Sequence, residues 1–353
     1  MDAVLERALV HGVRPLLHAR TVSANWPSAL VQSLRLAAVQ HAMFELRHQQ
    51  NLSHTLAELD TAGIQPVLVK GTALAYSVYS DPALRSRGDT DLLVAAHDKE
   101  RTEHILLALG YERAPGVSGE FVSYQASYGR RTAQGESHTL DLHWKINNSE
   151  LLSRLFTYEE LRRDAQPLPA LCPQALGASR IHALLLACMH RATHKQNPYY
   201  VGGKAQHAAD RQIWLYDIHV LASGFNSDEW SEYSRLAGQK GLRATCLEGM
   251  LLAQKCFHTV YPLNLLAAFA KPGPIEAPTC YLNGSRLRQQ WMDFAALGGF
   301  ARQLQWLREL FLPPRAYMRS KYPDRPISWL PWLYLRRAAD GLAKRLGRNN
   351  FGS

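Results

Sequence analysis

One stretch, Val67 to Val94, constrains the fold of this chain more than any other: VLVKGTALAYSVYSDPALRSRGDTDLLV. It begins with three consecutive apolar residues, which is typical of a short buried strand. A glycine at position 71 then opens a helix that we expect to run to about Tyr79. A turn and an arginine-bearing loop follow, and Gly88 to Val94 is expected to form a second strand. The stretch therefore predicts a strand, a tight turn into a helix, and a return strand.

The turn between the first strand and the helix has the composition of a phosphate-binding site. Gly71 lets the backbone approach a ligand closely, and Thr72 offers a hydroxyl and an N–H at a helix N-terminus, where the helix dipole favours phosphate. Lys70 would add a positive charge. This tripeptide is common in proteins, and a lysine before a helix is usually solvated, so the interpretation depends on the acids further along the chain.

Two acids alternate along the second strand. Because successive side chains of a strand point to opposite faces, Asp89 and Asp91 share one face, whereas Thr90 and Leu92 point to the other. Neighbouring carboxylates repel each other unless a cation lies between them. Mg²⁺ takes oxygen ligands and keeps bonds to water and to substrate phosphates, so it is the expected occupant. The alternative is a pair of solvated acids at the end of a strand.

A third acid lies on a later predicted strand. The segment from Phe121 to Ile146 has the pattern of a β-hairpin, with the polar turn TAQGES between its strands. In its second strand, Asp141 shares a face with His143 and Lys145. A two-metal site needs such an acid, because one acid of the pair binds both ions and another must hold the second ion. An edge strand with a polar outer face would show the same alternation.

Together these segments resemble the nucleotidyltransferases of the DNA polymerase β superfamily, which carry a glycine at a strand–helix turn, Asp-x-Asp or Asp-x-Glu on the next strand, and a later third Asp. The segment KGTALAYSVYSDPALRSRGDTDLLV resembles more closely a bacterial family known as uncharacterised nucleotidyltransferases, in which Lys-Gly-x-Ala-Leu-Ala, a Tyr, Asp-Pro, an Arg and Gly-Asp-x-Asp-Leu-Leu-Val recur. The resemblance covers roughly Val67 to Lys145. It implies an α/β (α+β) fold with a small mixed-sheet core.

The resemblance also implies a set of site residues. It assigns catalysis and metal binding to three acids: Asp89, Asp91 and Asp141. It assigns contacts with the nucleotide to the turn and to the loop that follows the helix: Lys70, Gly71, Thr72, Arg85 and Arg87. Thr72 stands where the superfamily more often has Ser, and the spacing from Gly71 to Asp89 is longer than in many members. Which phosphate Lys70 and the two arginines contact therefore stays open.

The implied reaction transfers an NMP from an NTP, ATP being one candidate, to a hydroxyl of a small-molecule or peptide acceptor and releases pyrophosphate. The acids would bind two Mg²⁺ ions, or Mn²⁺ in their place. Asp141 is a candidate proton acceptor for the hydroxyl, and Lys70 or an arginine would help to neutralise the leaving group. Two alternatives stay open: a toxin-like enzyme that modifies tRNA or another RNA, and a catalytically silent nucleotide-binding module.

Helical periodicity returns after Pro173. One predicted helix, Arg180 to His194, places His190 and His194 on the same face. A histidine pair at this spacing can bind zinc, but no Glu follows the first His. Lining of the cleft, or buried hydrogen bonds, is the favoured interpretation.

A second predicted helix carries acids beside an aromatic residue. Asp210, Trp214 and Asp217 fall on one helical stripe. Acids in this arrangement could hold a base or a ribose, and similar Trp-Leu-x-Asp segments occur in the same family, so Asp217 is a further candidate nucleotide-binding residue. The alternative is a helix packed through Trp214 with acids at its edge. The preceding residues 199–204, YYVGGK, are expected to form a mobile loop that could close over substrate, and the alternative is a simple connecting loop.

Positive charge is concentrated at the C-terminal end. The whole chain has a net charge of +10, and residues 301–353 hold eleven Lys or Arg against three Asp or Glu, a balance of +8. Such a segment attracts nucleic acid, anionic lipid or a nucleotide, and the alternative is a solvated basic face without a partner. Around Trp329 and Trp332, packing against the helical half is favoured over a helix on a membrane surface. A nucleic-acid partner is not favoured.

The rest of the composition narrows the class of protein. No segment has the length of a membrane span, and the first residues lack the features of a signal peptide. The five cysteines are scattered without a C-x-x-C pair, which predicts reduced thiols and a cytoplasmic protein. We expect N-terminal helices over residues 1–63, the nucleotidyltransferase core over 64–150, and a mainly helical domain with a basic end over 151–353. Residues 271–285, rich in Pro and Gly, are expected to be a linker or long loop.

Overall fold

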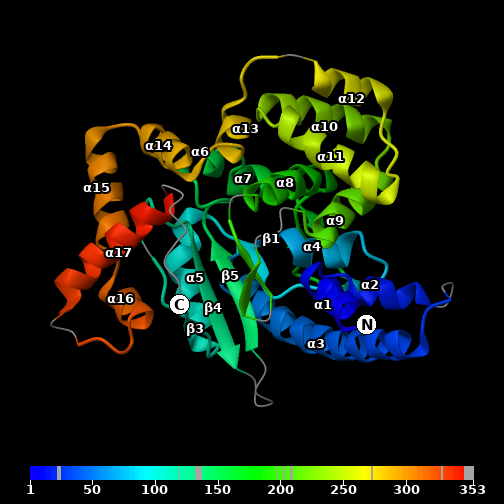
Figure 1. The fold of residues 1–353 in the computed structure, drawn as a ribbon, viewed down its shortest axis with the longest axis horizontal. Coiled ribbons are helices and arrows are strands. Elements are labelled where there is room, and N and C mark those ends of the chain that lie inside the picture. Colours follow the sequence, from blue (N-terminus) through cyan, green and yellow to red (C-terminus); the bar gives the residue numbers. More distant parts are fainter. Residues whose placement is uncertain are drawn as a thin grey trace.

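The computed structural model describes residues 1–21, 25–117, 119–131, 137–195, 197–201, 203–206, 210–271, 273–326 and 329–345. In these residues, helices surround a central mixed sheet (Figure 1). The predicted α/β class, with helices before the sheet and a mainly helical C-terminal half, is therefore confirmed. The division into three domains stays a prediction.

The N-terminal helices form as the apolar periodicity predicts. The described residues before the sheet contain α1 (Asp2–Val10), α2 (Arg14–Ala19) and α3 (Ser28–Thr61). The last helix ends just before Gly63, whose φ of +74° is a backbone conformation that side-chain-bearing residues rarely adopt. Its final turns bury a stripe of apolar side chains against the sheet: Leu52, Leu56 and Leu59.

The sheet combines antiparallel and parallel pairs. Among the described residues its seven strands lie in the order β3 (Glu112–Arg113), β4 (Gln125–Arg131), β5 (Ser137–His143), β2 (Thr90–Leu93), β1 (Val67–Val69), β7 (Leu176–Gly177) and β6 (Gln166–Pro167). β2 runs antiparallel to β1 and parallel to β5. The predicted hairpin is present as the antiparallel pair of β4 and β5, and most of its TAQGES turn lies outside the described residues.

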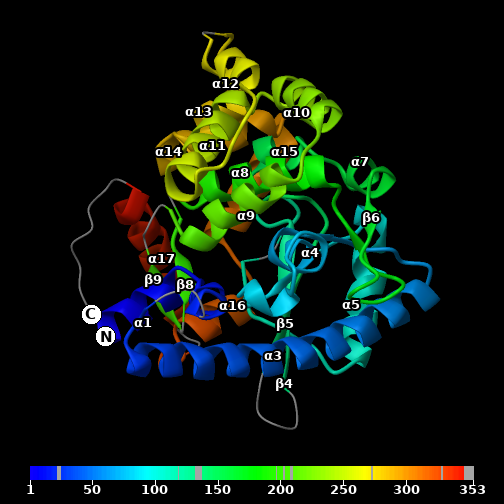
Figure 2. The same cartoon turned by 90° about the vertical axis from the view of Figure 1, so that its right-hand side faces the viewer.

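Alternation along the central strands creates two apolar layers. Leu68, Leu92 and Leu142 pack against α3 and against α5 (Lys99–Ala108). Val69 and Leu93 belong to the other layer, which includes the helices of the C-terminal half. These helices are α8 (Arg180–Thr193), α9 (Gln212–Ser223), α10 (Ser227–Gln239) and α11 (Arg243–Phe257). Figure 2 shows the two helical groups at opposite ends of the view, with α3 at the bottom and α10 and α11 toward the top.

Short elements connect these parts. Between β1 and β2 lie α4 (Lys70–Ser77) and the 3₁₀ turn η2 (Pro82–Leu84), and η3 (Ala96–Asp98) precedes α5. The remaining described helices are α6 (Glu150–Ser153), α7 (Tyr158–Arg163), α12 (Leu263–Ala270), α13 (Ala277–Leu282), α14 (Arg286–Ala296), α15 (Phe300–Phe311), α16 (Arg315–Lys321) and α17 (Leu330–Arg345). None of the described helices is both long and apolar enough to cross a membrane.

Two predictions about irregular segments are wrong. Residues 271–285 contain α13, because Pro278 lies in the first turn of that helix, where the missing N–H of proline breaks no hydrogen bond. Residues 199–201 and 204 belong to a short hairpin formed by β8 (Tyr199–Val201) and β9 (Lys204–Gln206), rather than to an open loop. In β8, Tyr199 is buried and Tyr200 is exposed, which is the alternation of a strand.

The C-terminal helices fold back on the core, and Figure 1 shows α14 to α17 as an arm on the left of the sheet. Glu309 of α15 accepts hydrogen bonds from the backbone N–H groups of Glu120 and Phe121, both at 2.9 Å. Asp293 of α14 accepts a hydrogen bond of 2.6 Å from the Ser149 hydroxyl. These contacts attach the arm to the segments that flank the β4–β5 hairpin.

The apolar side chains of the last helix pack only in part. Leu333 is buried, whereas Trp329 and Trp332 remain about half exposed and contact each other, with ring centroids 5.6 Å apart. The packing expected for this segment is therefore met by Leu333 but not by the two tryptophans.

The alternation of β2 predicts the effect of a core substitution. Leu92→Ala should lower the free energy of unfolding by about 2–5 kcal/mol, because it opens a cavity beneath the strand that carries Asp91. Leu107→Ala is the matched control, because that side chain on α5 is half exposed and its loss should cost less than about 0.5 kcal/mol. Urea unfolding of both variants measures the difference, and equal losses would contradict the assigned layers.

Candidate metal and nucleotide site

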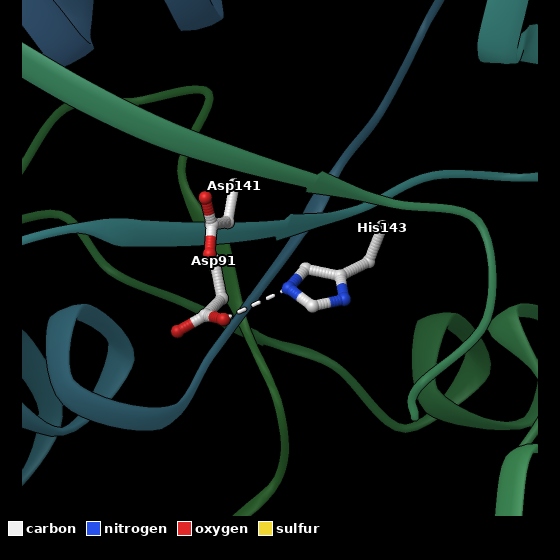
Figure 3. A group of neighbouring side chains, drawn as sticks. All are labelled: Asp91, Asp141 and His143. Atoms are coloured by element: carbon white, nitrogen blue, oxygen red, sulfur yellow. Dashed lines mark hydrogen bonds and ion pairs between the residues drawn. The ribbon is translucent and has the colours of Figure 1, made fainter. Parts of the chain in front are cut away.

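The two central acids lie side by side because of strand register. β2 and β5 pair in parallel with Asp91 directly opposite Asp141, and Val69 lies opposite Asp91 on β1. Figure 3 shows the two carboxylates on neighbouring strands, with the ring of His143 directed at Asp91. One potential ligand atom from each of Asp91, Asp141 and His143 lies within 4.8 Å of the others. Among the described residues, these three form the group suited to hold a metal ion.

His143 is a site residue to which the sequence analysis gave no role. It lies opposite Leu93 in the same parallel ladder, is buried, and its Nε2 is 2.9 Å from Oδ1 of Asp91. The Asp-Leu-His alternation had placed its side chain on the face of Asp141. That alternation is the sequence signal that places His143 beside Asp141 as a candidate metal-binding residue.

Asp141 is held by its neighbours on β4. Ser127 lies opposite it in the antiparallel ladder and donates a hydrogen bond of 2.5 Å to Oδ1. Gln125 donates a longer bond of 3.4 Å from Nε2 to Oδ2. Both oxygens of the carboxylate are therefore oriented before any ligand arrives.

Lys70 supplies a positive charge between the acids. Its backbone φ is +55°, and its ammonium group forms an ion pair with Oδ1 of Asp91. Burial alone would lower the pKa of Lys70, but the charge of Asp91 raises it above the ordinary value. Burial alone would likewise raise the pKa of Asp91, and Lys70 with His143 instead holds it well below its usual range. The pair is thus charged at neutral pH.

Asp89 differs from Asp91 in its charge state. It precedes β2 and lines the same cleft, and Lys70 pairs with Asp91 instead. Withdrawal from bulk solvent, followed by repulsion from Asp91 and Asp141, raises the pKa of Asp89 to about 7, although the residue keeps an exposed surface. Asp89 and Asp91 line the same cleft, but Asp89 lies just before β2 rather than in the strand, and it is only partly ionised at neutral pH.

The glycine turn borders the cleft, but the threonine hydroxyl does not. Gly71 lines the cleft and lies close to Arg85. Thr72 is buried, and its hydroxyl bonds to Oγ1 of Thr90 at 2.9 Å and to the carbonyl of Asp89 at 3.4 Å. The predicted contact between this hydroxyl and a triphosphate therefore has no support in the geometry, because the side chain is directed toward β2.

Arg85 and Asp217 are brought together, but they bind each other. Nε and Nη2 of Arg85 each donate a 2.7 Å hydrogen bond to the carboxylate of Asp217, and both residues are buried. The hydroxyl of Tyr79 donates a further bond of 2.6 Å to Asp217. With its carboxylate so occupied, Asp217 serves to hold Arg85 at the cleft wall. Asp210, the other acid of that stripe, precedes α9 and pairs with Arg191 at 2.6 Å.

Arg87 is also paired with an acid. Its guanidinium donates a 2.5 Å hydrogen bond to Oε1 of Glu45 on α3, and Tyr76 donates one of 2.5 Å to the same oxygen. Glu45 was not singled out from the sequence, because an isolated acid in a long helix carries no local signal. The pair ties the loop before β2 to the N-terminal helices.

The acids open onto a cleft of about 990 Å³, which is enough for a nucleotide and an acceptor together. Opposite the sheet, α8 and α9 supply His190, His194 and Trp214 to its wall. The arm contributes Gln289 and Trp306. The expectation that the histidine pair lines the cleft is therefore confirmed.

The histidine pair belongs to an aromatic cluster. The ring of His194 stacks on Trp214 with centroids 4.7 Å apart, and His190 meets the same tryptophan edge-on at 5.1 Å. Burial lowers the pKa of both histidines, so their rings are neutral at pH 7. Among the described residues no third metal-binding side chain accompanies the pair, and a zinc site is not formed there.

A strand, a glycine turn into a helix, and carboxylates on two neighbouring strands that line the same cleft as the glycine are the features of a nucleotidyltransferase core. The model of the family described as "Uncharacterised nucleotidyltransferase" matches residues 1–258, most of the 353-residue chain. The chain belongs to this family. The match spans the N-terminal helices, the sheet and α8 to α11, and it ends before the arm. A search of curated proteins found no match.

The raised pKa of Asp89 predicts a pH-dependent stability effect in the metal-free protein. Between about pH 4, the unfolded value, and pH 7, the folded state binds more protons, so the stability of the wild type falls as pH rises through this window. Asp89→Asn removes the ionisable group, so the variant should gain melting temperature over the wild type at pH 8 and lose that advantage at pH 5.

Asp228→Asn is the control for this comparison, because Asp228 is an exposed acid at the start of α10, outside the cleft. Its melting temperature should follow that of the wild type across the pH range. An offset of Asp89→Asn that does not change between pH 5 and pH 8 would contradict the assigned titration.

Proposed function

We propose that this chain is a divalent-metal-dependent enzyme that transfers an NMP from an NTP to a hydroxyl of a small-molecule or peptide acceptor, with release of pyrophosphate. One observation carries the proposal: Asp91 and Asp141 face each other in register, with His143 beside them, on the cleft that the Gly71 turn borders. Membership of the nucleotidyltransferase family supports the reaction class.

The donor set fits a divalent cation. Two carboxylates and one imidazole, with ligand atoms within 4.8 Å of one another, suit Mg²⁺ or Mn²⁺, and the nitrogen donor makes Mn²⁺ an effective substitute. When bound, the cation would supply positive charge that lowers the pKa of the acceptor hydroxyl and stabilises the leaving pyrophosphate. A second cation would require Asp89, which is close enough to Asp91 and Asp141 for their charges to raise its pKa.

The protein groups around the cation divide the remaining tasks. Ser127 and Gln125 orient Asp141, which is the candidate acceptor for the proton of the attacking hydroxyl. Lys70 neutralises Asp91 while no cation is bound, and a bound cation would release its ammonium group toward the phosphates. The backbone at Gly71 approaches the phosphates at the N-terminus of α4.

The arginines and Asp217 take positioning roles in this proposal. Arg85 and Arg87 are each neutralised by a buried acid, so they shape the cleft wall rather than supply free charge. The strong charge-assisted pair of Arg85 with Asp217 fixes α9 against the loop that precedes β2. In this proposal Asp217 therefore does not contact the ribose or base, as the sequence implied, but positions Arg85 at the cleft wall.

Asp91→Asn tests the function directly. The variant should fold, with a melting temperature below that of the wild type because Lys70 loses its acidic partner, and it should lose at least about 100-fold of Mg²⁺-dependent pyrophosphate release, because the amide cannot replace the carboxylate charge. Each NTP is incubated in turn with Mg²⁺ or Mn²⁺ and a lysate fraction, with and without added tRNA. Asp228→Asn, the same change outside the cleft, should keep full activity.

The result separates the alternatives. Undiminished turnover by Asp91→Asn would refute the assignment of the site. Turnover that requires tRNA would favour an RNA-modifying enzyme, and metal-dependent NTP binding without any turnover would favour a silent module.

A further inference from the structure

Most cations around the acids pair with an acid, and Arg211 is an exception among the residues that the structure describes. Lys70, Arg85 and Arg87 pair with Asp91, Asp217 and Glu45, respectively. Arg211 also lines the cleft, but within the described part of the chain it forms no ion pair. Its hydrogen bond within the described residues runs from Nε to the carbonyl of Val10 at 2.8 Å, and no described residue accepts a hydrogen bond from its two Nη groups.

The guanidinium of Arg211 is held in place before any ligand binds. It lies over the ring of Tyr199 at 5.3 Å and near that of Trp214 at 5.9 Å. On its other side is Gly12, with a φ of +71°, where an added Cβ would lie 3.0 Å from Nη2. In the turn between α1 and α2, the carbonyl of His11 also accepts a 3.2 Å hydrogen bond from the N–H of Ile213. Such a fixed guanidinium loses little conformational entropy when it binds an anion.

Acids near Arg211 compensate its charge only in part, and among the described residues none forms an ion pair with it. Burial, and then repulsion by Arg85, lower the pKa of Arg211 to about 10, whereas Tyr199, Asp217 and Asp89 oppose the shift. The group therefore stays protonated at neutral pH. Asp217 neutralises Arg85 through two hydrogen bonds, so it cannot also serve Arg211. An anionic ligand would supply the direct charge partner that the described residues do not give Arg211.

Arg211 lines the same cleft as Gly71, and Arg85 connects the surroundings of the two residues. Its electrostatic neighbours include Arg85 and Asp89, and Arg85 in turn lies against Gly71, where a Cβ would be 3.5 Å from Nη2 of Arg85. The guanidinium and the glycine turn thus border the same part of the cleft. A guanidinium presents parallel N–H groups that match phosphate oxygens.

We propose that Arg211 forms an anion subsite for the terminal phosphates of the NTP, the part that leaves as pyrophosphate. The inference rests on the proposed function and adds a residue outside the motif between Val67 and Val94. Arg211 would contact the phosphates directly, while Arg85 supports it from the cleft wall. Its position just before α9 makes the helical half contribute directly to recognition of the triphosphate.

Binding of inorganic tripolyphosphate in the presence of Mg²⁺ tests the subsite without knowledge of the base or the acceptor. Isothermal titration calorimetry with the full-length chain should show an affinity for Arg211→Met that is about 10- to 100-fold below that of the wild type, the range expected for charged hydrogen bonds. Arg211→Lys should recover part of the loss, because lysine keeps the positive charge but lacks the paired N–H groups of the guanidinium.

Arg14→Met is the matched control. Arg14 also donates to a backbone carbonyl of the N-terminal helices, at 2.9 and 3.0 Å to Leu5, but it does not line the cleft. Its loss should leave the tripolyphosphate affinity unchanged. An equal loss in Arg14→Met and Arg211→Met would show that the effect comes from packing of these helices, and it would overturn the proposal.

The other outcomes are equally decisive. No measurable binding of tripolyphosphate to the wild type, or unchanged affinity in a folded Arg211→Met variant, overturns the subsite. The subsite is also overturned if Arg211→Met changes only the KM of an acceptor, because the guanidinium would then bind an acidic group of that acceptor. Arg211-dependent binding in a wild type that shows no NTP turnover would support the subsite and contradict only the proposed function.

Discussion

The parallel pairing of β2 with β5 is the constraint on which the site depends. It sets Asp91 opposite Asp141 and brings the ring of His143 to Asp91, so three groups that would bind a cation are assembled by backbone hydrogen bonds rather than by loops. The cost of placing carboxylates together is reduced by Lys70, which pairs with Asp91. A slip of one residue in this ladder would direct the acids into the apolar layer against α3.

Charge pairing over long sequence distances fixes the walls of the cleft. Arg85 and Asp217 are 132 residues apart and join the loop before β2 to α9, whereas Arg87 and Glu45, 42 residues apart, join it to α3. Breaking either pair would leave a buried charge without a partner, which is strongly destabilising. The same logic distinguishes Arg211, a cleft arginine that forms no ion pair with the described residues and for which we propose an anionic ligand as partner.

Local patterns in the sequence predicted the elements that carry the site. Period-two alternation predicted that Asp141 and His143 share a face, and the structure brings both of them to Asp91. Asp89, predicted to lie on the strand of Asp91, instead lies just before β2. Strand order and side-chain partners could not be predicted in this way, because they depend on contacts between distant residues. The sequence predicts that Thr72 binds phosphate, but its hydroxyl is hydrogen-bonded to the hydroxyl of Thr90. It also predicts that Asp217 binds the nucleotide, but the carboxylate of Asp217 accepts hydrogen bonds from Arg85.

The position of a bound divalent cation tests the proposed site most directly. Anomalous diffraction from crystals of the full-length chain soaked in Mn²⁺ locates the ion without reference to activity. If Asp91 and Asp141 hold the cation, an anomalous peak should lie within coordinating distance of their carboxylates, with the ammonium group of Lys70 moved away from Asp91. A Mn²⁺ ion bound elsewhere, with Lys70 still paired to Asp91 and no peak between β2 and β5, would contradict this assignment.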